Sequence, residues 1–315
     1  MSTQVVGAKD GSLVLYENVG PTSVPDFGPR GGFISPVAAV ESSGNGAPAF
    51  GDIDGDADPD LILGSTDGGL VFYENVGDAG KPLFERKDLL DGLTVGEDST
   101  PALGDVGDGA LGLLVGNSDG TLVYYRKMDS TGFERVEGAD DPFAGIDVGE
   151  NSAPHFADLD DDGLPDLVVG AYDGRLSYFR NAGSLGAPLF VNTTAANPFV
   201  NISVGYYSAP ALADVDGDDD LDLFVGERGG ALIYYENTGS AAAPRRRLWG
   251  RSARSVCRTK TWSRAGLPQK AWENGNCRSI TSTVFHCLHG AEGSPGNMQQ
   301  SKPSTKVWLN TGAER

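Results

Sequence analysis

The sequence predicts an all-β protein, a β-propeller of four-stranded blades followed by a basic, irregular C-terminal tail. Three observations predict it: a unit of about 53 residues that recurs along the chain, short strand-like runs inside every unit, and little helical periodicity. Four short strands in a repeat of this length favour a propeller, because blades packed around an axis hide their sheet edges. A β-solenoid is the structural alternative, although its repeats are usually shorter.

Each repeat opens with a proline-containing segment that closes on an aspartate. The four copies are residues 47–52, 100–105, 153–158 and 209–214. The closing aspartate steps by 53, 53 and 56 residues from one copy to the next. Self-similarity at such a period is the signature of a repeat architecture.

Every copy continues with an Asp-rich loop, an apolar run that ends in Gly, a tight turn and an aromatic run. The first copy places the apolar run at 61–64 and the aromatic run at 70–75. The third copy places them at 167–170 and 176–181, around Asp173-Gly174. Asp-Gly supplies the positive φ that a hairpin turn needs, so these runs are predicted as paired strands. Stretches such as 84–86 and 190–192 predict a fourth strand.

About five blades are visible, and both ends of the series are incomplete. Residues 5–18 match the middle of a unit without its Asp loop, and the fourth full copy ends at 238–240, before its last strand. Either the two ends of the chain share one blade and close the ring, or the chain is a piece of a larger propeller. The partial copies favour the second interpretation.

The charge of the chain divides it into two parts. The 315 residues carry a net charge of −20, but residues 1–244 hold 41 acidic and 11 basic side chains, whereas residues 245–315 hold 3 and 13. We therefore predict propeller repeats over 1–244 and a basic tail over 245–315. The acidic balance argues against nucleic acid and anionic membrane surfaces as partners. No run of 18 apolar residues predicts a membrane span.

Several interpretations of the tail stay open. Its cysteines and histidines could suggest zinc, but no Cys-x-x-Cys pair occurs among Cys257, Cys277 and Cys287. The tail is predicted to be disordered or mis-translated, with a basic interaction segment as the alternative. Residues 307–312 resemble the blade string 234–239, which favours a retained intron in between.

Three acidic loops share one spacing and predict metal sites. Aspartates stand at loop positions 1, 3, 5 and 9, and position 7 offers its backbone carbonyl. The predicted ligands are Asp52, Asp54, Asp56, Asp58 and Asp60; Asp158, Asp160, Asp162, Leu164 and Asp166; and Asp214, Asp216, Asp218, Asp220 and Asp222. Calcium takes six to eight oxygen ligands, and so many neighbouring carboxylates would repel one another without a cation.

The helix–loop–helix calcium hand is an unsuitable explanation for these loops. That motif needs a bidentate Glu at position 12, where this chain has Leu63, Val169 and Val225. Solvated turns without metal remain the alternative. The remaining copy, which starts at Asp105, is one residue shorter and lacks most ligands, so we predict no metal there or a weak site.

The Asp-x-Asp-Gly-Asp loops, each followed by an apolar run and Gly, resemble FG-GAP/VCBS repeats over roughly residues 5–244. The resemblance extends to the N-terminal propeller of integrin α subunits, which has seven blades. It implies calcium in the blade hairpins, away from the face that contacts ligands. It also implies roles in adhesion or carbohydrate binding, and some relatives carry attached enzymatic domains.

Function is therefore predicted to be non-catalytic binding of a protein or glycan by a monomeric calcium-binding module. No catalytic arrangement stands out, and His155 is expected to serve structure. Extracellular calcium suits such loops, so we expect an extracellular or cell-surface location. No signal peptide is visible, which a truncated N-terminus would explain. The alternatives are the non-catalytic part of a polysaccharide-active enzyme and a structural spacer.

Overall fold

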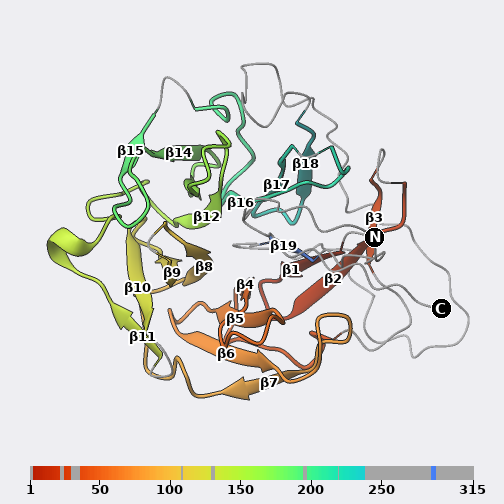
Figure 1. The fold of residues 1–315 in the computed structure, drawn as a ribbon. Helices are drawn as coiled ribbons and strands as arrows, with labels where there is room; N and C mark the ends of the chain where they lie inside the picture. The colour runs from red at the N-terminus through yellow and green to blue at the C-terminus, as the bar shows by residue number, and fades with distance from the viewer. Residues whose placement is uncertain are drawn as a thin grey trace, which may run out of the picture.

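The computed structural model describes residues 3–21, 25–29, 36–107, 109–128, 132–193, 197–218 and 220–237, with the backbone of 285–288. Apart from the 3₁₀ turn η1 (Gly138–Asp140), every regular element in these residues is a β-strand. Within the same residues, no helix has the length and apolar character to span a membrane. Five antiparallel sheets surround a common axis (Figure 1). The predicted all-β propeller is confirmed.

We number the five sheets as blades 1 to 5. Blade 1 holds β1 (Thr3–Gly7), β2 (Leu13–Asn18), β3 (Phe27–Pro29) and β19 (Phe285–Leu288). Blade 2 holds β4 (Ala47–Gly51), β5 (Asp60–Gly64), β6 (Leu70–Asn75) and β7 (Phe84–Lys87). Blade 3 holds β8 (Thr100–Asp105), β9 (Leu111–Gly116), β10 (Leu122–Met128) and β11 (Gly132–Arg135). Blade 4 holds β12 (Ala153–Ala157), β13 (Asp166–Gly170), β14 (Leu176–Asn181) and β15 (Phe190–Asn192). Blade 5 holds β16 (Ala209–Ala213), β17 (Asp222–Gly226) and β18 (Leu232–Tyr235).

Strand order inside a blade follows the repeat. The proline segment forms the strand nearest the axis, and the apolar run, the aromatic run and the short fourth strand follow outward (Figure 1). Each predicted strand is found at its predicted place. Blade 5 has three strands in the part of the chain that is described, as expected from a repeat that stops early.

The second strand of blades 2 to 5 is buried along almost its whole length, which explains its unbroken apolar sequence. All five residues of β5, of β13 and of β17 are buried. A strand covered on both faces reads as a continuous hydrophobic run, whereas a half-exposed strand alternates. The third strand β6 does alternate in part, because its outer positions approach solvent.

Five clusters of buried side chains join the blades in a ring. Four of them lie between successive blades, from blade 1 to blade 5. The fifth joins Val6 and Phe27 of blade 1 to Phe224 and Tyr234 of blade 5. The rings of Phe27 and Phe224 meet edge to face with centroids 5.4 Å apart. Burial of large aromatic side chains therefore closes the ring between the first and last repeats.

Blade 1 combines strands from distant parts of the chain. Strand β19 pairs with β1 along its length and contacts both β16 and β4, so it takes the innermost place in this blade. This is the ring-closing arrangement in which both ends of the chain contribute to one blade. The other predictions for residues 245–315 fall outside the described part, except that His286 and Cys287, two residues of the zinc interpretation, lie in β19, of which only the backbone is described.

A glycine at the end of the second strand lets neighbouring blades approach closely. A Cβ atom on Gly64 would lie 2.1 Å from the carbonyl oxygen of Ser99, and one on Gly170 would lie 1.9 Å from that of Ser208. Real Cβ atoms do not come this close to backbone. Each of these glycines is therefore required by contact with the next blade.

A buried serine that precedes the innermost strand ties each of blades 3, 4 and 5 to the blade before it. Ser152 Oγ accepts a hydrogen bond from Asn117 N (2.9 Å) and donates one to Thr121 O (2.7 Å). Ser99 and Ser208 bond the equivalent atoms of their preceding blades. These bonds satisfy backbone groups that would otherwise be buried without partners. In blade 2, Gly46 stands at this position.

Candidate functional site

The acidic loops link the first and second strands of blades 2, 4 and 5. They leave the inner strands at Gly51, Ala157 and Ala213, at one end of the ring axis. Residues with positive φ turn the chain inside them, such as Gly55 (φ 88°) and Gly163 (φ 85°). This curvature allows the carboxylates of positions 1 and 3 to approach one another.

Three carboxylates come together in each loop. In every set, ligand-type oxygens lie within 4.8 Å of one another: Asp52, Asp54 and Asp60; Asp158, Asp160 and Asp162; Asp214, Asp216 and Asp218. The remaining predicted positions are outside these sets: Asp56, Asp58, Leu164, Asp166, Asp220 and Asp222. The structure thus brings loop positions 1 and 3 together each time, with position 9 in blade 2 and position 5 in blades 4 and 5.

The aspartate at position 9 is a buried brace. Asp166 Oδ1 accepts a hydrogen bond from Asn181 N (2.8 Å), and its Oδ2 accepts one from Tyr178 Oη (2.7 Å). Asp222 is held in the same way by Asn237 N and Tyr234 Oη. Burial raises the pKa of Asp166 to about 6 and that of Asp222 to about 7. These side chains tie the loop to the third strand of the same blade.

The shorter loop of blade 3 has lost this brace. Gly112 takes the place of the position 9 aspartate, opposite Gly104 in the β8–β9 pair. The ring of the fully buried Tyr124 fills the space, since a Cβ on Gly112 would lie 2.7 Å from it. Asp105 Oδ1 instead accepts hydrogen bonds from Gly107 N and Gly109 N. That this loop binds metal weakly or not at all remains a prediction.

The donor set of the three carboxylate clusters suits a hard divalent cation. Burial and the negative charge of Asp218 raise the pKa of Asp216, and burial with neighbouring carboxylates raises that of Asp54. One oxygen of Asp216, Oδ1, is buried without a hydrogen-bond partner. A cation of the calcium type would satisfy this oxygen and offset the repulsion between the carboxylates.

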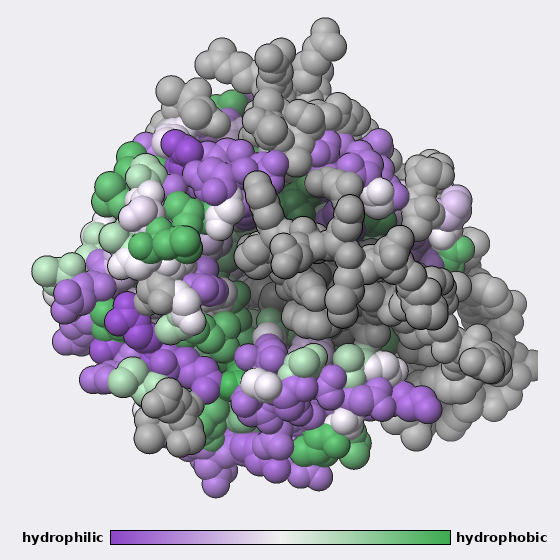
Figure 2. Space-filling model, in the orientation of Figure 1, coloured by the Kyte–Doolittle hydropathy of each residue, from purple (hydrophilic) through white to green (hydrophobic). Residues whose placement is uncertain are grey.

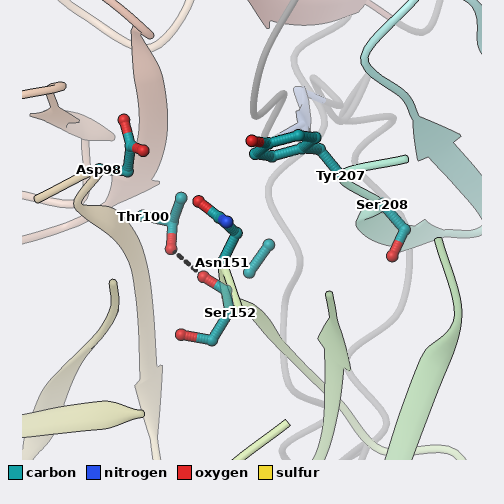
Figure 3. Close-up of a pocket in the computed structure, with 7 residues that line it drawn as sticks. Asp98, Thr100, Asn151, Ser152, Tyr207 and Ser208 are labelled. Atoms are coloured by element: carbon teal, nitrogen blue, oxygen red, sulfur yellow. Dashed lines mark hydrogen bonds between the residues drawn. The ribbon is translucent and has the colours of Figure 1, made fainter. Parts of the chain in front are cut away.

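A small pocket lies at the opposite end of the inner strands. Its lining comes from three blades: Asp98, Thr100, Asn151, Ser152, Ala153, Tyr207 and Ser208. Figure 3 shows the Tyr207 ring directed toward the side on which Asp98 and Asn151 lie. Five-residue strands such as β12 separate this inner pocket from the acidic loops. The molecule therefore has two candidate sites at opposite ends of the same strands.

Equivalent residues before the inner strands, three of which line the pocket, share an unusual backbone conformation. Asn45, Asp98, Asn151 and Tyr207 all precede the inner strands and have φ between 47° and 56°. Asn and Asp enter this left-handed region readily, whereas a bulky side chain rarely does. Tyr207 is therefore the strained member of the set, and strain of this kind clusters at functional sites.

Aromatic side chains extend from the pocket over blades 4 and 5. The Tyr172 ring lies 4.9 Å from the Tyr207 ring and 5.3 Å from the Tyr206 ring, between centroids. The Arg228 guanidinium lies 5.5 Å from the Tyr207 centroid. Tyr206 is 54% exposed. An accessible aromatic platform thus adjoins the carboxylate and amide groups of the pocket.

Comparison with known proteins agrees with the repeat. Residues 158–225, which run from the acidic loop of blade 4 to the second strand of blade 5, match the family model for an FG-GAP-like repeat. Residues 158–225 therefore form an FG-GAP-like repeat within this β-propeller. No curated protein matches the chain. Among solved structures, it is similar to a lectin of Agrocybe aegerita that recognises non-reducing terminal N-acetylglucosamine. The identity is 18% and the TM-score 0.40, over 76% of this chain and 60% of the lectin chain, less than two thirds of its length.

Sequence reasoning about this β-propeller predicted the acidic loops but missed the inner pocket. Its residues stand about one repeat apart in the chain, and only the ring assembles them. One sequence pattern could have indicated the pocket, because its residues Asp98, Asn151 and Tyr207 all stand two positions before a Thr-Pro or Ala-Pro pair. His155, by contrast, is buried in β12, and its Nε2 accepts a hydrogen bond from Leu212 N (3.1 Å).

Proposed function

We propose that this β-propeller, with its FG-GAP-like repeat, is a calcium-binding module that binds a protein or carbohydrate outside the cell and has no catalytic activity. The buried, unpartnered Oδ1 of Asp216, next to Asp214 and Asp218, carries the calcium part of the proposal. A carboxylate oxygen in that state is costly unless a cation or donor meets it. The cation would hold the loop and thereby brace the blade.

Calcium is expected to raise the melting temperature of the full chain. A ligand that binds only the folded state adds about 2.7 kcal/mol per site at a hundredfold excess over Kd. For a domain of this size, that corresponds to roughly 5–10 °C per site. Thermal melting monitored by circular dichroism, with calcium and then with a chelator, measures the difference.

Two variants sharpen this test. Asp216→Asn removes a proposed ligand charge and is expected to abolish much of the calcium-dependent increase. Asp88→Asn removes an exposed carboxylate far from the loops along the chain and is expected to leave that increase unchanged. Identical melting curves with calcium and with chelator would rule out the calcium part of the proposal.

The ligand-binding end is proposed to be the inner pocket with its tyrosine platform. Aromatic faces stack on the apolar faces of sugar rings, and carboxylate and amide groups bond their hydroxyls, so carbohydrate is the better-supported ligand class. The strained Tyr207 supports this choice, because the other blades place Asn or Asp there without strain. The described surface in Figure 2 is largely hydrophilic with small, separate apolar patches.

Substitutions on the platform are expected to weaken binding by tenfold or more. Screening against an array of immobilised glycans identifies an oligosaccharide, and calorimetric titration with it compares the variants. Tyr206→Ala removes the exposed ring, and Tyr207→Asn installs the residue found at the equivalent positions 45 and 151. Leu185→Ala, at an 80% exposed residue of the outer part of blade 4, is the control.

Other outcomes of that screen decide between the alternatives. Capture of a protein partner by wild type but not by Tyr206→Ala would keep the site and change the ligand class to protein. Unchanged glycan affinity in both tyrosine variants would refute the platform. A protein that binds neither glycans nor partners would be a structural spacer, and a longer transcript encoding a catalytic domain would indicate part of an enzyme.

A further inference from the structure

The three acidic loops differ in one residue of the neighbouring third strand. The aromatic runs align as residues 70–75, 122–127, 176–181 and 232–237. Their fifth positions are Glu74 in blade 2, Arg126 in blade 3, Arg180 in blade 4 and Glu236 in blade 5. A position beside a cluster of carboxylates thus carries an acid in two blades with a full loop and a base in the third.

Arg180 makes direct contact with the carboxylates of its loop. Its Nε donates a short hydrogen bond to Asp160 Oδ2, and its Nη2 donates one of 3.0 Å to Asp162 Oδ2. Asp160 and Asp162 are two of the three clustered residues of this loop. The Arg180 side chain is 44% exposed and those of the two aspartates 23% and 30%, so the ion pairs are partly shielded from water. Charge-assisted hydrogen bonds such as these are stronger than hydrogen bonds between neutral groups.

Glu74 has the opposite effect in blade 2. Its charge is one of the causes that raise the pKa of Asp54, which places the two carboxylates close enough to repel. Lys87 Nζ, 3.5 Å from Glu74 Oε2, offsets this from the outer strand. The loop of blade 2 therefore adjoins a Glu74–Lys87 ion pair, whereas in blade 4 a guanidinium binds the loop carboxylates directly.

We infer that Arg180 acts as a built-in cation in the loop of blade 4, so that this loop does not take up calcium at concentrations that fill the loops of blades 2 and 5. The guanidinium occupies carboxylate oxygens that a metal would need, and a metal would have to displace it. Asp160 Oδ1 remains buried without a partner, so a ligand oxygen is available once the guanidinium is removed. This inference rests on the proposed calcium binding and assigns it to two of the three loops.

Calcium stoichiometry tests the inference. Isothermal titration of calcium into the chelator-treated full chain is expected to give two tight sites for the wild type. Arg180→Glu, which installs the residue of blades 2 and 5, is expected to give three sites. The Kd of the blade 4 loop for calcium is expected to be at least tenfold lower in this variant than in the wild type. Glu236→Arg is expected to reduce the count to one. Arg175→Gln removes an exposed positive charge of the same blade and is expected to leave two.

A second readout separates a missing site from a misfolded variant. Without calcium, Arg180→Glu is expected to melt at a lower temperature than the wild type, and calcium is expected to restore the difference. Three equivalent sites in the wild type, or two in Arg180→Glu with wild-type melting, would overturn the role of Arg180 while leaving calcium binding intact. No calcium bound by the wild type or by Arg180→Glu would overturn both the proposed function and this inference.

Discussion

Replacing Gly170 with Ala is expected to destabilise the propeller by about 3 kcal/mol or more and to lower its melting temperature by roughly 10 °C. The added Cβ would lie 1.9 Å from Ser208 O and 2.9 Å from Pro210 Cδ, both in the segment that starts the next blade. Strand pairing holds the backbone on both sides, so neither atom can move away without disturbing the paired strands. Blades 4 and 5 would have to separate.

The control for this prediction is Gly28→Ala in β3, whose added Cβ would find its nearest heavy atom at 4.0 Å. That variant is expected to melt within a few degrees of the wild type. Urea unfolding gives the free energies when a variant melts irreversibly. If Gly170→Ala unfolds at the same urea concentration as Gly28→Ala, the close approach of the blades is not rigid, and contact with the next blade does not explain why glycine recurs at this strand end.

Lowering the pH from about 7 to about 4.5 is expected to cost the folded protein roughly 2–3 kcal/mol through His155 alone. Burial lowers the pKa of His155 from 6.5 to about 4. Above pH 6.5 the imidazole is neutral in both folded and unfolded chains and has no effect. Below it, the unfolded chain takes up a proton that the folded chain cannot, so stability falls until the pH reaches about 4.

Buried carboxylates shift stability in the opposite direction, which makes a matched variant necessary. Burial raises the pKa of Asp60 to about 6, so its protonation favours the folded state as the pH falls. His155→Gln keeps an acceptor for Leu212 N but does not ionise. Urea unfolding at several pH values, in chelator, is expected to show a stability difference between wild type and variant that narrows or reverses as the pH falls. A constant difference would mean that the folded protein binds a proton on His155.

The fold was predictable because its information is local and repeated. Short apolar and aromatic runs between Gly and Asp predict the strands β5, β6, β13 and β14. Because the same runs recur in four copies, chance does not explain them. The closure between blades 1 and 5 was not predictable. It depends on the contact of Phe27 in the first repeat with Phe224 in the last, and on β19 from the tail region.

The candidate sites divide in the same way. Loop positions 1 and 3 were predicted as clustered ligands and do cluster, since their spacing is set within a few residues. The position 9 aspartate was predicted as a ligand, and this stays a prediction; in blades 4 and 5 the structure shows it bracing the loop against the third strand. Arg180 went unnoticed because it lies 20 residues from Asp160 in the chain, and only the pairing of β13 with β14 places it over the loop.

The sequence alone determined the repeat, the strand order within a blade and the three acidic loops, because each depends on residues close together in the chain. Tertiary structure alone decided how the blades close into a ring, which loop has a guanidinium over it, and how Asp98, Asn151 and Tyr207 come to line one pocket. These contacts join residues about one repeat or more apart, or residues on paired strands. Their geometry arises from blade packing, which no local pattern encodes.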